Sequence, residues 1–442
     1  MSGLDDAEAR RRVSRRRFLT GLGAAAGAAL ATGYGVSVWQ RDGTTTTKTA
    51  HQPAPPTLGG RDDRTLVVVE LAGGNDGLST VVPMSDPAYA QLRPTLAVAN
   101  PIPLDGDFGL HPNLVKLAAR AKAGHVAVVE GVGYPDPNLS HFASLAYWWT
   151  GNPGEGSGAG WLGRYLDATV GFADPLAAVG IGPVPSPALL GDRSFATSIT
   201  DSTGLQPTVP PWADSPDDLV RAWSRFAPAS PDVSTVVGEV QRAIHLTVEA
   251  RGELNADLGN AGAGATGPAD QLATGRAQGN YRQSASVADS MRLAARLVAA
   301  DHAPRVIYVS GLGDYDTHEG QAQRHPALMA DLDDGVDAFF TALEAAHVEE
   351  RALVMTVSEF GRRAAENGSG TDHGAAAPHF FVGASVQGGR YGTPPSLTAL
   401  DDHGNLVHTV DFRVLYATAL QSWLGVDAEA IVGKGFVPLP VV

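Results

Sequence analysis

The chain of 442 residues contains no cysteine, and this absence excludes several kinds of chemistry at once. Without thiols the protein has no disulfide, no thiolate metal site, no cysteine nucleophile and no lipid-modified cysteine anchor. Basic residues are also scarce, because 32 Lys and Arg stand against 47 Asp and Glu, which gives a formal charge of −15. Nucleic-acid binding depends on Lys and Arg that meet phosphates, so no nucleic acid binding is expected.

Residues 1–40 are interpreted as a targeting segment rather than as part of the fold. The sequence Ser14-Arg-Arg-Arg-Phe-Leu-Thr20 precedes an uncharged run, rich in Ala and Gly, from Gly21 to Val38. A charged stretch before a weakly apolar one is typical of a twin-arginine signal, which predicts export by the twin-arginine machinery. The exported protein is then periplasmic, cell-wall-associated or secreted. Residues 41–64, with a threonine tract and several prolines, are typical of a flexible linker.

Four short apolar runs in the rest of the chain each end in a cluster of carboxylates, amides or histidines. They are Leu66 to Leu71, Val126 to Val132, Val306 to Val309 and Leu353 to Val357. Short β-branched runs separated by helical stretches are typical of buried parallel strands, whose carboxyl ends are where open α/β sheets bind ligands. The sequence therefore predicts an α/β fold with a mostly parallel central sheet and with polar side chains that converge on one of its edges.

Residues 65–442 are expected to form this α/β domain, with an insert or lid at about 175–275. Pro183 to Pro216 is rich in Pro, Ser and Asp and shows no periodicity, and loops of this length are usually functional or disordered. Apolar residues at helical spacing predict the helices that connect the strands. These helices are expected at 114–124, 234–254, 284–300, 326–347 and 411–424.

The polar clusters after the apolar runs supply candidate metal ligands. Carboxylate oxygens and imidazole nitrogens without thiolates suit a divalent metal ion, whether Zn, Mn, Mg or Ca. A capped turn before a helix would also explain the two aspartates of Asp314-Tyr-Asp-Thr-His318, but it would not explain the histidine, and this favours the ligand interpretation. The candidate ligands are Asp76, Asp314, Asp316, His318, Glu359, Asp372 and His373.

Arg362 is a candidate for binding an anionic substrate, because the guanidinium fork fits phosphate or sulfate oxygens. Surface salt bridges explain an arginine at this position equally well.

Several segments resemble the opening of sulfatases and other alkaline-phosphatase-like enzymes, in which a helix and a strand lead to a nucleophile near the start of a further helix. These segments are His111 to Ala119, Val126 to Gly131, Asn138 to Leu145 and Trp149 to Gly151. Together with the twin-arginine leader, further motifs make nearly everything after Thr65 similar to the exported family catalogued as domain of unknown function 1501. They are Gly73 to Gly77, Ser140-His141, Asp316-Thr-His318, Ser358 to Arg362 and Thr371 to Gly374.

The resemblance implies an alkaline-phosphatase-like three-layer sandwich with a metal-dependent hydrolase core. It places Asp76 among the metal ligands after the first strand and Ser140 as the nucleophile, with His141 beside it. It also places Asp316, His318 and His373 as later ligands. The chain departs from the family pattern in two ways. Glu359-Phe360 replaces an Asp-His pair, so Asp372-His373 would have to supply the imidazole, and Asp314 competes with Asp316 for one position.

We therefore expect an exported metal-dependent hydrolase of phosphate or sulfate esters, with an anionic small molecule or polymer as substrate. Ser140, or a metal-bound water, is the expected nucleophile, and His141 and Arg362 complete the expected catalytic set. The alternative is a non-catalytic exported binding or assembly protein that keeps the fold, with or without a structural metal. In that case the partner is another exported protein.

Overall fold

A computed structural model of the chain describes residues 63–171, 174–182, 185–194, 196–200, 215–232, 235–260 and 286–442. The predicted twin-arginine segment, residues 1–40, and the predicted linker up to residue 62 lie outside the described residues. The first described strand begins at Thr65.

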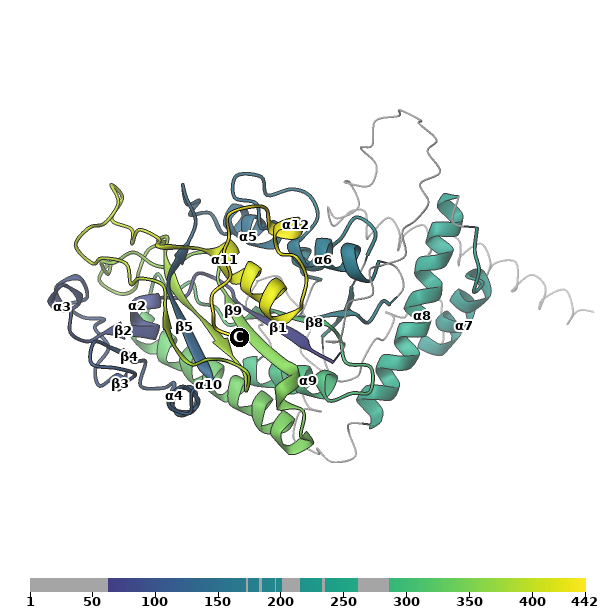
Figure 1. Cartoon of the computed structure of the whole chain (residues 1–442), viewed down its shortest axis with the longest axis horizontal. Helices are drawn as coiled ribbons and strands as arrows, with labels where there is room; N and C mark the ends of the chain where they lie inside the picture. The colour runs from purple at the N-terminus through teal and green to yellow at the C-terminus, as the bar shows by residue number, and fades with distance from the viewer. Residues whose placement is uncertain are drawn as a thin grey trace, which may run out of the picture. The chain divides into compact units, whose positions relative to one another are not determined.

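A nine-stranded sheet runs through the described part of the chain (Figure 1). The four apolar runs predicted as strands are β1, β5, β8 and β9, so these predictions are confirmed. The strand order is β11-β5-β10-β9-β1-β8-β6-β7, and β12 pairs with β5. The strands are β1 (Thr65–Leu71), β5 (Val126–Gly133), β6 (Ala178–Ile181), β7 (Thr197–Ile199), β8 (Val306–Leu312), β9 (Ala352–Val357), β10 (Ala377–Val382), β11 (Gly389–Tyr391) and β12 (Val410–Asp411).

Among the described strands of this sheet, β10 alone runs antiparallel to its neighbours, β5 and β9. The other pairs, from β1 with β8 and β9 to β6 with β7, are parallel. The carboxyl ends of β1, β5, β8 and β9 therefore lie at one edge of the sheet, and β10 brings its amino end to the same edge. The predicted mostly parallel α/β sheet is confirmed, and the edge that it predicts for ligands exists.

Helices cover both faces of the sheet, which gives the three layers that the sequence analysis expects (Figure 1). Figure 1 shows α9 and α10 on one side of the strands and α5, α6 and α11 on the other. The helices are α2 (Gly77–Thr80), α3 (Pro87–Leu92), α4 (Val115–Lys122), α5 (His141–Thr150), α6 (Trp161–Thr169), α7 (Pro216–Phe226), α8 (Val236–Asn260), α9 (Val287–Val298), α10 (Gln321–Ala346), α11 (Phe412–Ala417), which continues as a π-helical stretch (Thr418–Trp423), and α12 (Glu429–Val432).

The strands form without interruption because their β-branched side chains are buried on both faces. Leu66 and Val68 pack in one core cluster with Trp148 of α5 and Trp161 of α6. Residues at alternate positions, such as Val67, are equally buried on the opposite face. Burying such a side chain contributes about 1.5–3 kcal/mol, so a central strand of this kind is held firmly and can position the loop that follows it.

The insert or lid expected at about 175–275 stays a prediction, but the first part of this range contributes two strands to the central sheet. Residues 178–181 and 197–199 form β6 and β7, two strands of the central sheet. Both strands are short and stand in a segment rich in proline, so they lack the apolar run by which the longer strands are recognised. Of the described residues, 215–232 and 235–251 belong to one compact unit, and the others belong to a second. In the first unit, α7 begins after Ser215, whose hydroxyl accepts a hydrogen bond from the backbone N–H of Asp218.

A small second sheet in the order β2-β4-β3 precedes α4 in the chain. Its strands are β2 (Val81–Pro83), β3 (Ile102–Pro103) and β4 (Phe108–Leu110). Within the described ranges, the helices are all too short or too polar to cross a membrane.

Candidate metal centre

The loops that follow β1, β8 and β9 meet the segment before β10 at the common edge of the sheet. The backbone N–H of Gly73 donates to Oε1 of Glu359 (2.8 Å), and the N–H of Thr371 donates to the carbonyl of Thr317 (3.2 Å). Gly73 has a φ of +111°, and a Cβ atom there would collide with the backbone nitrogen of Asp316. The absence of a side chain therefore lets the β1 loop close directly against the β8 loop.

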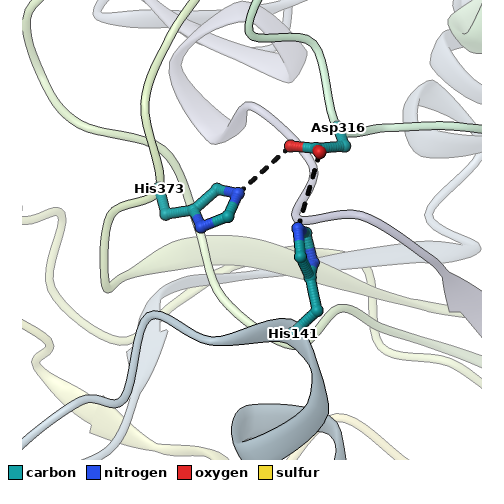
Figure 2. Close-up of side chains that lie close together, drawn as sticks. All are labelled: His141, Asp316 and His373. Carbon is teal, nitrogen blue, oxygen red and sulfur yellow. Dashed lines mark hydrogen bonds and ion pairs between the residues drawn. The ribbon is translucent and has the colours of Figure 1, made fainter.

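Three imidazoles surround the carboxylate of Asp316 at this edge. Figure 2 shows His141 and His373 pointing toward this carboxylate from different segments of the chain. His373 Nε2 and His318 Nε2 each lie 3.1 Å from Oδ1 of Asp316, and His141 Nε2 lies 3.5 Å from Oδ2. The Nε2 atoms of His318 and His373 are 2.9 Å apart. His141, Asp316 and His373 thus form a group of potential ligands, and His318 lies next to Asp316 and His373.

Each of these imidazoles has a hydrogen-bond acceptor at its other ring nitrogen. Nδ1 of His141 lies 2.8 Å from Oε1 of Glu359, and Nδ1 of His373 lies 2.8 Å from the carbonyl of Leu139. Nδ1 of His318 lies 3.3 Å from Oδ1 of Asp372. An acceptor at Nδ1 can hold a proton there, so with an ion bound the Nε2 lone pairs would be free to ligate it. Metal-ligating histidines are held in this way in most proteins.

The spacing of these atoms fits a bound divalent ion. Ligand atoms at zinc distances of 2.0–2.1 Å in a tetrahedral arrangement lie roughly 3.3 Å apart. The potential ligand atoms of His141, Asp316 and His373 lie within 4.8 Å of one another. Three carboxylates, those of Asp316, Glu359 and Asp372, stand around the centre, and a divalent cation there would add to the positive charges of Arg362 beside Asp316 and Arg363 near Asp372.

A buried oxygen without a partner also marks this region as incomplete. Glu359 is 1% exposed, and its Oε2 has no hydrogen-bond partner among the described residues. Hydrogen bonds to Asp316 and then to Glu359 raise the pKa of His141 to about 9. Without an ion, His141 is therefore a cation between two carboxylates. A metal ion would replace the proton on Nε2, because a ligating imidazole must be neutral.

Asp316 is held as an anion. Burial acts to raise its pKa, but hydrogen bonds from His141, His373 and Arg362 outweigh burial and lower the pKa well below the usual range of an aspartate. Asp316 is therefore ionised near neutral pH, as a metal ligand must be.

Arg362 holds the loops of the centre together. Its side chain is fully buried. Its Nε donates to the carbonyl of Gly74 (2.7 Å), its Nη1 to that of Thr371 (2.8 Å), and its Nη2 to that of Tyr315 (3.1 Å) and to Oδ1 of Asp316 (2.7 Å). These contacts account for its burial and fix the β1, β8 and β10 segments relative to one another. The expected contact of Arg362 with a substrate anion stays a prediction.

Asp76 does not share the position of the imidazoles, although the resemblance implies that it binds a metal. It is fully buried, and its two oxygens accept hydrogen bonds from Arg93 (2.6 and 3.1 Å), from Ser79 Oγ (2.8 Å) and from the side chain of Gln321. Burial acts to raise the pKa of Asp76, but the charge of Arg93 lowers it well below the usual range. The guanidinium therefore neutralises this carboxylate.

The two aspartates of the β8 loop take different places. Asp316 lies among the imidazoles, whereas Asp314 is half-exposed and forms an ion pair with Arg324 of α10 (2.7 Å).

Ser140 is exposed and is the residue before α5, and its backbone N–H donates to Oδ1 of Asn138 (2.9 Å). The described residues show no hydrogen bond from its hydroxyl to the centre. Glu359 and Asp372 lie at the Nδ1 atoms of His141 and His318. One imidazole ring therefore separates each of these carboxylates from the region in which the Nε2 atoms meet.

Sequence reasoning placed His141 beside the nucleophile and missed it as a candidate ligand. The signal was present, because Ser140-His141 follows a strand in the same way as the other three clusters. Phe360, read only as a replacement for a missing histidine, packs against the rings of His373 (4.4 Å between centroids) and His141 (5.0 Å). Arg93 gave no signal of its own, because its partner Asp76 is 17 residues away and its other contacts come from beyond β9.

Glu70, near the carboxyl end of β1, carries another buried carboxyl group. Its Oε2 accepts hydrogen bonds from Tyr308 (2.7 Å) and Trp149 (2.8 Å), and burial raises its pKa to about 7. A carboxyl with a raised pKa favours the folded state at low pH, and this contribution is lost as pH rises from the unfolded value through about 7.

We therefore expect Glu70→Gln to stabilise the protein near pH 8.5, by up to about 3 kcal/mol, and to have little effect near pH 5. The melting temperature at the two pH values measures this difference. The same change at exposed Glu429 serves as the control and should shift neither value. A Glu70→Gln protein that is destabilised at both pH values would show that the carboxylate form is the one the fold requires.

The fold and the centre define an α/β protein with a His/Asp group at the carboxyl edge of a mostly parallel sheet, where an ion can be held. The chain belongs to the family described as "Protein of unknown function (DUF1501)", which matches residues 63–435. The resemblance stated from the motifs is confirmed for this family.

Solved structures with a similar arrangement include members of the alkaline phosphatase superfamily. A protein of that superfamily from Vibrio parahaemolyticus is 11% identical over 86% of this chain and 73% of its own, with a TM-score of 0.37. A sulfatase from Pseudoalteromonas sp. is 12% identical over 86% and 71%, with a TM-score of 0.35. An alkaline phosphatase from the Antarctic bacterium TAB5 is 12% identical over 75% and 95%, with a TM-score of 0.29. No curated protein matches the chain.

Proposed function

We propose that the protein is an exported, metal-dependent hydrolase of phosphate or sulfate esters. The observation that carries the proposal is the set of three imidazoles whose Nε2 atoms converge on Asp316 while their Nδ1 atoms are held by acceptors. Three nitrogens and one carboxylate favour Zn or a similar transition metal over Mg and Ca, which prefer oxygen ligands. Export by the twin-arginine route rests on the sequence of residues 14–38.

When bound, a divalent ion would lower the pKa of a water molecule and neutralise charge on the ester oxygens. The chain's own residues prepare this chemistry. Glu359 holds the ring of His141, and Arg362 holds the carboxylate of Asp316. His141 is also the first residue of α5, so the amino end of a helix of 10 residues lies at the centre. Amide N–H groups at a helix amino end favour anions such as a phosphate or sulfate group.

The placement of Ser140 supports water rather than this hydroxyl as the attacking group. Ser140 is exposed, and its hydroxyl makes no hydrogen bond with His141, Asp316 or His373 within the described residues. An activated serine is normally within hydrogen-bond reach of its base or beside the metal.

Hydrolysis by the purified protein tests the proposal. The protein, loaded in turn with Zn, Mn, Mg or Ca, is assayed against aryl phosphates, phosphate diesters and aryl sulfates, and we expect turnover of at least one class with Zn or Mn. Ser140→Ala should keep this activity within about fivefold, whereas loss by more than about 100-fold would identify Ser140 as the nucleophile. A protein that holds metal and turns over no substrate in any pairing would contradict the hydrolase proposal.

One observation favours the non-catalytic alternative. Arg362, the group expected to bind the substrate anion, is buried and bonded to the protein itself. In that case the centre is a structural metal site of an exported binding or assembly protein. Pull-down of a stoichiometric exported partner, together with wild-type behaviour of Ser140→Ala, would support this alternative.

A further inference from the structure

A cavity lies apart from the metal centre and is lined by none of the residues of that centre. Its volume is about 400 Å³, within the range of small-molecule sites. Most of its wall is apolar and comes from α2, β2, β4, β10 and the segment around residues 394–406. The apolar wall residues are Leu78, Val81, Pro83, Phe108, Ala376, Ala377, Pro378, Pro394, Pro395, Leu397 and Leu406.

Glu130 of β5 lines this cavity with a carboxyl group that is only partly satisfied. The residue is 4% exposed, and its Oε1 receives one long hydrogen bond from Nε of Arg390 (3.3 Å). Its Oε2 makes no hydrogen bond with any described residue. Because this oxygen belongs to a carboxyl group that lines the cavity and receives no donor from the described residues, a ligand donor fits beside it.

The cavity wall has only one sign of charge. Asp86 and Asp107 line it together with Glu130, and no Lys, Arg or His stands among the lining residues that the structure describes. The nearby guanidinium of Arg390 is shared, because its Nη1 forms an ion pair with Asp105 (2.6 Å) while the group lies over the ring of Phe108 (3.7 Å). The guanidinium of Arg390 therefore pairs with both Glu130 and Asp105, and the cavity wall keeps a net negative charge.

We infer that this cavity binds a small organic cation, with an apolar body against the proline and leucine wall and a protonated amine against Glu130. An alcohol of the same shape would lack the charge, and a carboxylate would meet the like charges of the wall. Burial raises the pKa of Glu130 to about 7, so the carboxylate is present at and above neutral pH, where alkylamines are still protonated.

Binding of three matched probes tests this inference: 2-phenylethylamine, 2-phenylethanol and 3-phenylpropionate, titrated into the full-length protein near pH 8 and followed by ligand-observed NMR. We expect the amine to bind at least about tenfold more tightly than the alcohol, which is the size of effect that one charge-assisted hydrogen bond gives, and the carboxylate not to bind. Glu130→Gln should remove the preference for the amine.

Two further variants make the result specific to the cavity. Glu253→Gln changes an exposed glutamate and should leave all three affinities unaltered, whereas Ser396→Trp fills the exposed rim and should weaken every probe. Equal affinities for the three probes, an unchanged preference in Glu130→Gln, or no binding of the amine would overturn the inference. These outcomes are independent of ester hydrolysis, because no residue of the metal centre lines the cavity.

Discussion

Asp316→Asn is expected to abolish binding of the divalent ion, with a loss of affinity of more than about 100-fold, and to abolish ester hydrolysis with it. Loss of an outer-shell partner alone typically costs about 10- to 100-fold in metal affinity, and Asp316 is the group on which all three Nε2 atoms converge. The amide also removes the carboxylate charge that lies directly among the described imidazoles. Isothermal titration with Zn, with metal content of the dialysed protein as a second readout, measures the effect.

Asp314→Asn is the matched control, because it makes the same substitution two residues away in the same loop. Its carboxylate pairs with Arg324 and makes no hydrogen bond with the three described imidazoles, so we expect metal affinity within about threefold of the wild type. His403→Ala, at an exposed histidine, controls for the loss of an imidazole in a parallel His373→Ala variant, which should lose the ion as Asp316→Asn does. Equal affinities of the Asp314 and Asp316 variants would show that the ion is held elsewhere or not at all.

The central strands are predicted well because strands that are buried on both faces consist almost entirely of apolar residues. A strand covered on both faces needs apolar, mostly β-branched residues throughout, and β1, β5, β8 and β9 have them. The sequence of β10 lacks a continuous apolar run, because Pro378 and His379 interrupt the apolar residues. β6 and β7 have four and three residues, which is too short for any periodicity to be read. Strands of this kind are specified by their neighbours in the sheet rather than by their own residues.

The location of the centre was predictable, but its internal geometry was not. Polar clusters after parallel strands must meet at one edge, so Asp316, His318 and His373 were correctly gathered there. The choice between Asp314 and Asp316 depends on the path of the loop, which Gly73 and Arg362 fix from elsewhere in the chain. Local sequence carries no information on such long-range contacts. Hydrogen bonds that set the imidazole orientation are equally non-local, as the bond between His373 and Leu139 illustrates.

Removal of the buried ion pair of Asp76 and Arg93 should have the second large effect, on stability rather than on metal binding. Both side chains are essentially fully buried and their closest atoms are 2.6 Å apart. Replacing one partner leaves an uncompensated buried group, so Asp76→Asn and Arg93→Met are each expected to lower the free energy of unfolding by about 3–5 kcal/mol. Urea denaturation measures this loss. Asp334→Asn, which breaks an exposed pair with Lys116 (2.8 Å), should cost less than about 1 kcal/mol.

The metal content of the same variants separates two roles of Asp76. Because Arg93 already supplies the positive charge that this carboxylate needs, we expect the centre to take one ion per chain and folded Asp76→Asn to retain it. The Asp76→Asn, Arg93→Met double variant should be more stable than the sum of the single losses predicts, since it leaves no buried charge unpaired. Two ions in the wild type, or loss of the ion in an Asp76→Asn protein of normal stability, would instead make Asp76 a ligand, as the family resemblance implies.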